Sequence, residues 1–322
     1  MPFTPCSLIA SLPPLNCDQN SAFAGYADFC RLYQLEFGSL AASQHLGQVG
    51  IEGQQIAVHL FRPQRPTGTL VIVHGYLDHH GLYRHLIRYG LERGLNILCF
   101  DLPGHGLSSG TRASIDSFEH YQAVFQTLLG KLPEWRLCRP LHLLGQSTGG
   151  AIINQFLLTT PAQSPEIDGR IVLLAPLVRP ARWRWVRLAH ALLSPWKTAV
   201  TRDFSANSQD PAFNAFLRRD PLQSPLISTA WIGAMQRWIR TFEQLPPTNA
   251  YQPLLIQGQQ DNTVDWSYNL PLLRQKFPRL QHLLLPNARH QLANETAETR
   301  QQYLDWLDLQ GFANRAGVRP YI

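Results

Sequence analysis

One serine lies in a sequence context that is typical of a catalytic nucleophile. The chain reads Gly-Gln-Ser-Thr-Gly-Gly over residues 145–150, after a short apolar run typical of a buried strand and before a helical stretch. Glycines flank such a serine because the turn from strand to helix leaves no room for side chains, while the serine itself is held in a strained conformation. We therefore predict that Ser147 is a nucleophile at the end of a strand.

A serine hydroxyl needs a histidine to accept its proton, and that histidine needs an acid to fix its tautomer. Where the nucleophile occupies this kind of turn, the chain order is serine, acid, histidine. Asp261 and His290 each follow a predicted strand, so both should lie at the same sheet edge as Ser147. Asp265 is the alternative acid, although it is better placed to cap the following helix. We predict that Asp261 is the acid and His290 the base.

An acyl-transfer site also needs backbone N–H groups that stabilise a developing oxyanion. Thr148 is one expected donor because it follows the nucleophile. We expect the second donor in the loop after the strand that ends at His74, most simply the backbone N–H of Tyr76. Gly75 permits a tight loop there, and an ordinary glycine turn is the alternative interpretation.

Strand-like and helix-like runs alternate along most of the chain. The predicted strands are 55–61, 69–74, 95–100, 141–144, 171–174, 254–257 and 282–285, and the predicted helices are 82–92, 118–132, 151–158, 269–276 and 295–309. Proline and glycine between the first two strands suggest a hairpin. The alternation predicts an α/β protein with a mainly parallel central sheet and helices on both faces.

The alternation stops near residue 176 and resumes near 254. The interval is rich in Trp, Arg and Pro and shows no strand pattern, so we predict a helical cap, or lid, inserted over 177–251. The predicted core comprises 51–176 and 252–322, and 1–50 form an N-terminal arm and lead-in.

Within the cap, a basic and aromatic segment provides candidate contacts to substrate or lipid at Arg182, Trp183 and Trp185. The alternative is a helix that packs its apolar side over the site and leaves its arginines in solvent.

Composition narrows the class of protein. The chain has 322 residues, of which 44% are hydrophobic and 16% charged, as in a globular protein. No run approaches the roughly 20 apolar residues of a membrane-spanning helix, and the first twenty residues lack the cations of a secretory signal. The five cysteines show no metal-binding spacing, so we expect no metal and a reducing compartment. The net charge of +6 suits anionic lipid or serves solubility alone, whereas nucleic acid is disfavoured because no recognition module is present.

Four segments together resemble the monoacylglycerol lipase and lysophospholipase branch of the α/β-hydrolases, which is also grouped with serine aminopeptidase S33-type hydrolases. Residues 74–83 are similar to a His-Gly-x-x-Glu-His-x-x-x-Tyr loop, and 100–108 to an Asp-x-x-Gly-His-Gly-x-Ser segment. The other two are the turn at 145–150 and the pair of Asp261 and His290. The resemblance spans about residues 50–310 outside the cap and implies an α/β-hydrolase fold.

The chain departs from this family pattern near the nucleophile. Asp78 stands where the family usually has Glu, and Gln146 and Thr148 replace a frequent His and Met. The resemblance therefore carries over the triad but not the local substrate contacts. The resemblance also implies that Asp101 and His105 belong to a structural loop, although each could otherwise serve as a nucleophile, a metal ligand or a base.

These observations predict a serine hydrolase of carboxylic esters that acts through an acyl-enzyme and needs no cofactor. A lysophospholipase or monoacylglycerol lipase-type lipid esterase is favoured. The alternatives are a small-ester carboxylesterase, an aminopeptidase-like amidase, and a membrane-binding scaffold with a degenerate site. We expect a lipid or small ester substrate, peripheral membrane contact through the basic cap, no nucleic acid partner and a cytoplasmic location. The headgroup and the oligomeric state stay open.

Overall fold

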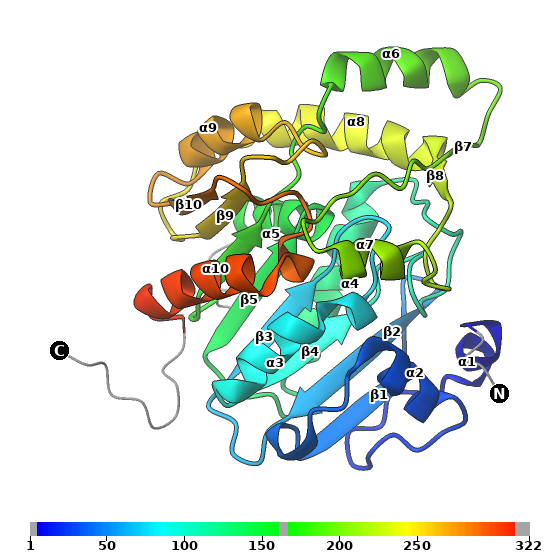
Figure 1. Cartoon of the computed structure of the whole chain (residues 1–322), viewed down its shortest axis with the longest axis vertical. Coiled ribbons are helices and arrows are strands. Elements are labelled where there is room, and N and C mark those ends of the chain that lie inside the picture. The colour runs from blue at the N-terminus through cyan, green and yellow to red at the C-terminus, as the bar shows by residue number, and fades with distance from the viewer. Residues whose placement is uncertain (1–4, 161–166, 313–322) are drawn as a thin grey trace.

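A central sheet of eight strands organises the computed structural model, which describes residues 5–160 and 167–312 (Figure 1). The strand order is β1-β2-β4-β3-β5-β6-β9-β10. In the described part of this sheet, only the β1–β2 and β2–β4 pairs are antiparallel, which confirms the predicted mainly parallel sheet. The bounds are β1 Ser43–Ile51, β2 Gln54–Arg62, β3 Gly68–Val73, β4 Leu95–Phe100, β5 Leu141–Gln146, β6 Ile171–Leu174, β9 Leu254–Gly258 and β10 Gln281–Leu285.

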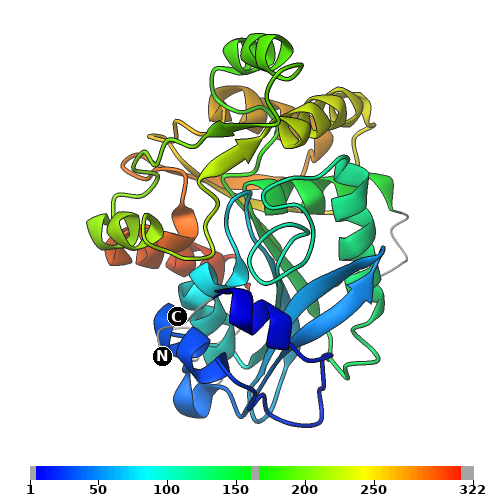
Figure 2. The same cartoon turned by 90° about the vertical axis from the view of Figure 1, so that its right-hand side faces the viewer.

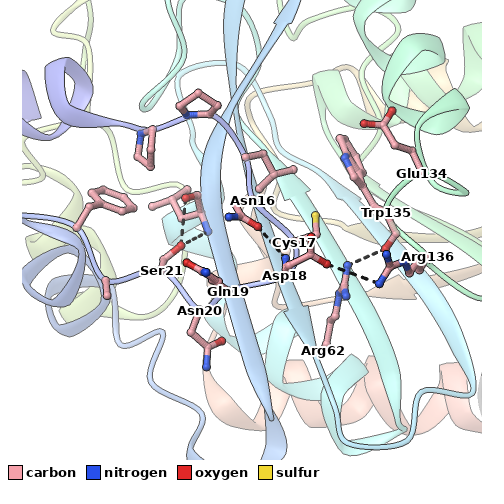
Figure 3. Close-up of a pocket in the computed structure, with 16 residues that line it drawn as sticks. Asn16, Cys17, Asp18, Gln19, Asn20, Ser21, Arg62, Glu134, Trp135 and Arg136 are labelled. Carbon is pink, nitrogen blue, oxygen red and sulfur yellow. Dashed lines mark hydrogen bonds and ion pairs between the residues drawn. The ribbon is translucent and has the colours of Figure 1, made fainter.

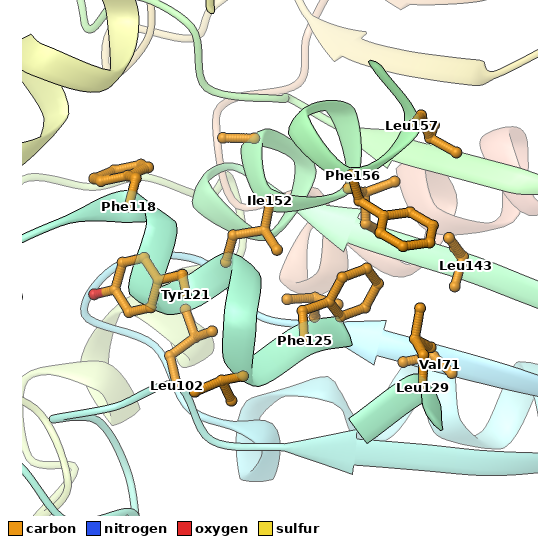
Figure 4. Packing of buried hydrophobic residues seen from close by; sticks show 14 of the residues in the cluster. Val71, Leu102, Phe118, Tyr121, Phe125, Leu129, Leu143, Ile152, Phe156 and Leu157 are labelled. Carbon is orange, nitrogen blue, oxygen red and sulfur yellow. The ribbon is translucent and has the colours of Figure 1, made fainter. Parts of the chain in front are cut away.

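Helices cover both faces of this sheet, as the alternation predicts. Side chains along β3 alternate between the two resulting cores, with Val71 in one and Ile72 in the other. In the first core Phe125 packs edge-on against Phe156 with ring centroids 5.4 Å apart (Figure 4). This core includes helices α4 Phe118–Gly130, α5 Thr148–Thr159 and α9 Trp266–Lys276, and the second includes α2 Tyr26–Tyr33, α3 Arg84–Glu92 and α10 Ala297–Leu309.

The hairpin predicted between residues 55–61 and 69–74 is wrong. β2 pairs with β1 and β4, and β3 pairs with β4 and β5, because the connection through α3 inserts β4 between them. The hairpin that forms joins β1 to β2 through Glu52 and Gly53, whose φ values are 50° and 74°. Positive φ at both central residues is what the twist of a tight hairpin requires.

The N-terminal segment contributes more than the predicted arm. It contains α1 (Pro5–Ser11), α2, the short helix η1 (Gly38–Leu40) and the edge strand β1. The stretch after α1 runs along the outer edge of β1, where the Leu15 amide donates to the Gln48 carbonyl at 3.0 Å and the Gln48 amide to Pro13 at 2.8 Å. Figure 3 shows the surface cavity that this stretch forms with Arg62 and Trp135.

The segment between β6 and β9, which contains the predicted cap, lies beyond the carboxyl ends of the parallel strands (Figures 1 and 2). It is mainly helical, as expected, but it also holds a two-stranded antiparallel sheet of three residues per strand, too short to leave an alternating pattern in the sequence. No described helix is long and apolar enough to cross a membrane. The cap elements are α6 Trp183–Leu193, β7 Ala199–Thr201, α7 Pro211–Leu217, β8 Leu226–Ser228 and α8 Thr229–Gln244.

Candidate active site

Ser147 occupies the turn between β5 and α5. Its φ of 52° and ψ of −113° are rare for a residue with a side chain. Three backbone hydrogen bonds hold it there. The Ser147 amide donates to the Leu174 carbonyl at 2.9 Å, and the Ser147 carbonyl accepts from Ala151 and Leu177, each at 3.0 Å. The end of β6, the first turn of α5 and the start of the segment after β6 therefore fix the strained conformation of Ser147.

The positions around Ser147 require glycine because the neighbouring backbone leaves no room for a Cβ. A Cβ added to Gly149 would lie 2.0 Å from the Val73 carbonyl oxygen, and one added to Gly145 would lie 2.6 Å from the Gly149 backbone. Neither obstacle is a flexible side chain, so only glycine fits. The same close packing brings Gly75 against the turn, where an added Cβ would lie 3.2 Å from the Cβ of Ser147.

His290 and Asp261 meet at the neighbouring strand ends. Asp261 follows β9 and His290 follows β10, and His290 Nδ1 lies 2.7 Å from Asp261 Oδ2. The Thr263 and Val264 amides donate to the other carboxylate oxygen at 2.7 and 3.1 Å, and Gln257 Nε2 donates to Oδ2 at 3.0 Å. The carboxylate is thus fixed from several sides before it orients the imidazole.

Both members of this pair are buried, which alone would favour their neutral forms. Burial lowers the pKa of His290, but the adjacent Asp261 carboxylate outweighs it and leaves the pKa raised above 6.5. Burial likewise raises the pKa of Asp261, and His290 with the surrounding donors reverses this, so that its pKa falls below 3.8.

Asp265 has the capping role that its position suggests. Its carboxylate accepts from the Tyr268 amide at 3.2 Å, at the start of α9, and from the Ser267 hydroxyl at 2.8 Å. The structure therefore pairs Asp261, and not Asp265, with His290.

Ser147 and His290 line one cavity of about 300 Å³ beneath the cap. Tyr76 and Thr148, the expected oxyanion donors, line it too. The Tyr76 ring stacks on Trp231 of α8 with centroids 3.7 Å apart, and its hydroxyl donates to the Ala113 carbonyl at 2.7 Å. The remaining wall is largely apolar and includes Leu77, Leu177, Val186, Ile227, Ile232, Met235 and Val264.

A buried network that the sequence did not predict joins the loops that carry Tyr76, Ser147 and His290. Gln291 Nε2 donates to both oxygens of Asp78 at 2.8 and 2.9 Å, and the Gln291 carbonyl oxygen accepts from Gln146. Tyr83 donates to Asp78 at 3.1 Å and accepts from the Gly75 amide at 3.1 Å. The signals in the sequence were the two departures at 78 and 146. Gln291 lies in no motif, and its partners are 145 and 213 residues away along the chain.

Asp101 and His105 take structural positions, as the resemblance implies. Asp101 accepts from the backbone amides of His80 and Leu107, both at 2.7 Å, and its Oδ1 lies 2.8 Å from the His80 ring. His105 Nδ1 lies 2.9 Å from the Pro103 carbonyl oxygen. Neither residue lines the cavity beside Ser147.

The cap candidates Arg182, Trp183 and Trp185 do not line the cavity either. Arg182 is exposed just before α6, Trp183 is half-buried against the core, and Trp185 is 70% exposed. From α6 the structure instead directs Val186 to the cavity, and from the stretch after β7 it directs Arg202. The orientation of α6 depends on its packing against α8, which the pattern of the segment does not encode.

Comparison with known proteins places this geometry in a family. Residues 64–297 match the family model described as serine aminopeptidase, S33. A monoacylglycerol lipase of Mycolicibacterium smegmatis is 27% identical over 76% of this chain and 89% of its own length. A phospholipase of Bacillus subtilis is 32% identical over 64% and 80%, and a monoglyceride lipase of Mus musculus is 31% identical over 67% and 73%.

Solved structures share the fold at lower identity. A monoacylglycerol lipase of Paleococcus ferrophilus superposes with a TM-score of 0.65 at 22% identity, covering 78% of this chain and 98% of that one. A soluble variant of the Saccharomyces cerevisiae monoglyceride lipase gives 0.69 at 19% identity, covering 85% and 98%. The chain therefore belongs to the serine aminopeptidase S33 family, in the monoacylglycerol lipase-like branch of the α/β-hydrolases, and is an ester hydrolase.

Proposed function

We propose that the chain is a lysophospholipase or monoacylglycerol lipase-type lipid esterase in which Ser147, His290 and Asp261 form a catalytic triad. One observation carries the proposal. A serine in a strained strand-to-helix turn and a histidine paired with a buried carboxylate line the same largely apolar cavity. That arrangement is the one in which a serine hydroxyl becomes a nucleophile.

The reaction proceeds in two halves. His290 takes the proton from Ser147 as the serine oxygen attacks the ester carbonyl, and the backbone N–H groups of Tyr76 and Thr148 stabilise the oxyanion, each by roughly 3–4 kcal/mol. His290 then gives the proton to the departing alcohol, which leaves an acyl-enzyme. Water attacks this ester after losing a proton to His290, and the fatty acid is released as Ser147 regains its hydrogen.

The cavity supports a substrate with one acyl chain. Its volume of about 300 Å³ and the aliphatic side chains and Trp231 in its wall suit a single hydrocarbon tail. Relatives named monoacylglycerol lipase and phospholipase fit the same substrate class.

The cap adds a surface for the membrane in which such lipids reside. No residue of α6 is buried, and Trp185, Leu188 and Leu192 are at least half exposed, as is Trp196 just beyond the helix. Exposed arginines also lie on α6. In Figure 1, α6 is the helix farthest from the central sheet. Tryptophan and leucine beside cations suit the interface of an anionic bilayer, so we infer peripheral contact with lipid through α6.

Fatty acid release from a matched panel tests the enzymatic proposal. Short-chain esters, monoacylglycerols and lysophospholipids are given to wild type, Ser147→Ala and the control Ser267→Ala, whose serine is exposed on α9. Wild type and the control should prefer long chains, and Ser147→Ala should lose roughly 10³-fold or more. Labelling of wild type, but not of Ser147→Ala, by a fluorophosphonate probe should agree. No turnover of any ester, or a preference for aminoacyl amides, contradicts the proposal.

A further inference from the structure

One charged side chain in the cavity wall has no part in the proposed reaction. Arg202 follows β7 and lines the cavity that Ser147 and His290 share. One guanidinium nitrogen donates to the side-chain oxygen of Gln223 at 2.6 Å, and the group lies over the Phe204 ring, 4.5 Å from its centroid. Both contacts are neutral. Among the described residues, no ion pair includes Arg202.

The carboxylates near Arg202 already have other partners. Asp78 accepts from Gln291 and Tyr83, and Asp220 is 2.8 Å from His79 and accepts from Tyr33 at 2.6 Å.

Asp203, the other carboxylate in the cavity wall, is exposed. Burial lowers the pKa of Arg202, and Asp78, Tyr76 and Asp220 only partly oppose this. A partly buried guanidinium without its own carboxylate favours an anion supplied from outside the chain.

Polar and apolar residues of the cavity wall come largely from different segments of the chain. One continuous stretch supplies four polar residues, Arg202, Asp203, Ser205 and Asn207. Other loops supply Asp78, Thr263 and Gln291. α8 supplies the apolar residues Trp231, Ile232 and Met235, and the other apolar residues come from α6, β8 and the loops after β3, β6 and β9. An ester held at Ser147 can therefore place its hydrocarbon against α8 and a polar group against the stretch that follows β7.

We propose that Arg202 is a specificity-determining residue that binds an anionic group of the substrate and so favours a lysophospholipid, through its phosphate, over a neutral monoacylglycerol. This inference rests on the proposed ester hydrolysis at Ser147. The anion could also be a carboxylate at the far end of the acyl chain. The shared chemistry is a guanidinium–oxyanion contact of the kind in which two nitrogens donate to two oxygens.

Three esters with the same ten-carbon acyl chain, all below their micellar concentrations, separate these sources. They are a 1-acylglycerol, the corresponding lysophosphatidylglycerol, and a 1-acylglycerol whose chain ends in a carboxylate. kcat and KM are measured for wild type, Arg202→Gln and Arg202→Lys. The matched control is Arg240→Gln, which removes an exposed cap arginine outside the cavity.

Wild type should prefer an anionic ester. Arg202→Gln should raise its KM by roughly 10- to 100-fold, the loss of one or two hydrogen bonds to a charged group. kcat and the constants for the neutral ester should change less than about twofold, because Arg202 touches no reacting atom. Arg202→Lys should retain part of the selectivity, and Arg240→Gln all of it. The anionic ester that loses affinity identifies the phosphate or the carboxylate as the group that Arg202 binds.

Two outcomes overturn the role of Arg202 and leave the proposed function intact. One is an equal loss on neutral and anionic esters in Arg202→Gln, with unchanged circular dichroism, which indicates a structural role. The other is a wild-type preference for the neutral ester that neither Arg202 variant alters. If Arg202→Gln does not fold, Arg202→Lys decides the question. A higher KM for one anionic ester in Arg202→Lys, with the neutral ester and Arg240→Gln unchanged, supports the guanidinium contact. Selectivity in Arg202→Lys equal to that of wild type overturns it. Failure of wild type to hydrolyse any of the three esters overturns the proposed function itself.

Discussion

The pairing of Asp261 with His290 decides when the proposed base is ready to accept a proton. The ring is buried, yet its pKa is raised because the carboxylate 2.7 Å away favours the imidazolium. A base must be neutral to act, so the same contact that orients His290 also keeps it protonated at acidic pH. The pH dependence of the free enzyme should therefore report this contact.

We expect kcat/KM to rise with pH through a pKa above 6.5, because His290 loses its proton only there. In Asp261→Asn, His290 stays buried but loses the neighbouring negative charge, so its pKa should fall. The acidic limb of the pH profile, where kcat/KM rises, should therefore move to lower pH. The maximal rate should fall by about 10⁴-fold because the tautomer is no longer fixed. Rates on a short water-soluble ester from pH 5 to 9 measure both effects.

Asp265→Asn is the matched control, since it keeps a capping side chain at α9 and should leave the limb unchanged. An acidic limb that stays in place in Asp261→Asn, or that moves equally in Asp265→Asn, contradicts the assignment of the acid.

The position of a single residue in the fold was predictable where a short motif or a strand end marks it. Ser147 lies in its own motif, and Asp261 and His290 follow strands whose ends share an edge with it. Gln291 and Arg202 had no such mark. Their environments come from segments that meet only in the folded chain, as when Gln291 contacts Asp78 across 213 residues.

At the scale of elements, the two parts of the cap are held very differently. The stretch between α7 and β8 is tied to the core through Asp220, which lies 2.8 Å from His79 and accepts from Tyr33 of α2 at 2.6 Å. All three side chains are buried. By contrast α6 buries no residue and contacts mainly α8. The cap thus combines an anchored lower part with an exposed helix.

This exposed helix should mediate lipid binding. The purified chain is sedimented with vesicles of phosphatidylcholine alone or mixed with phosphatidylglycerol. Binding to the mixed vesicles should fall about tenfold or more when three cations are lost, since each contributes about 1 kcal/mol near an anionic surface. It should also fall when Trp185 and Leu192 are both changed to Ser. The charge variant is Arg182→Ser, Arg184→Ser and Arg187→Ser.

A control variant loses the same number of positive charges at exposed arginines that lie far from α6 in the sequence. It tests whether net charge alone explains the decrease in binding. Unchanged sedimentation of both α6 variants, or an equal decrease in the control, rules out a lipid role for this helix. The control combines Arg65→Ser, Arg274→Ser and Arg279→Ser.

Elements were predictable wherever a run is long enough to show a period. The parallel strands are short apolar runs that the sequence marks clearly, and their helices begin and end within a few residues of the predicted bounds. The partners of β2 could not be predicted from the sequence. Its neighbour β4 lies between it and β3 only because α3 crosses the sheet, and adjacency in sequence favoured the wrong partner.

At the scale of the whole molecule, β1 and β10 are the two edge strands of the central sheet. Unpaired backbone groups on β1 would allow another strand to pair with it. The stretch after α1 covers part of it through hydrogen bonds between Leu15 and Gln48, and between Ser21 and Gln44 at 3.0 Å. Leu8 and Leu12 of the preceding segment are buried against the second core. The sequence predicted only an N-terminal arm and lead-in here, because its prolines and polar residues hide the register that β1 imposes.

Gly47 provides a single-residue test of this cover. A Cβ there would lie 2.5 Å from the Cα of Leu15 and 3.0 Å from the Pro13 carbonyl oxygen, so Gly47→Ala should push the covering stretch away from β1. We expect a loss of roughly 1–3 kcal/mol in the free energy of unfolding, as for other overpacked sites, together with concentration-dependent association through the opened edge.

Gly50→Ala is the matched control in the same strand. Its added Cβ would meet only the Gln55 side chain, at 3.9 Å. Urea unfolding and size-exclusion chromatography at several concentrations compare the two variants with wild type. If Gly47→Ala unfolds at the same urea concentration as Gly50→Ala and both remain monodisperse, the stretch after α1 does not protect the edge of the sheet. If only Gly47→Ala is destabilised and associates, the N-terminal segment protects the otherwise open edge of the whole sheet.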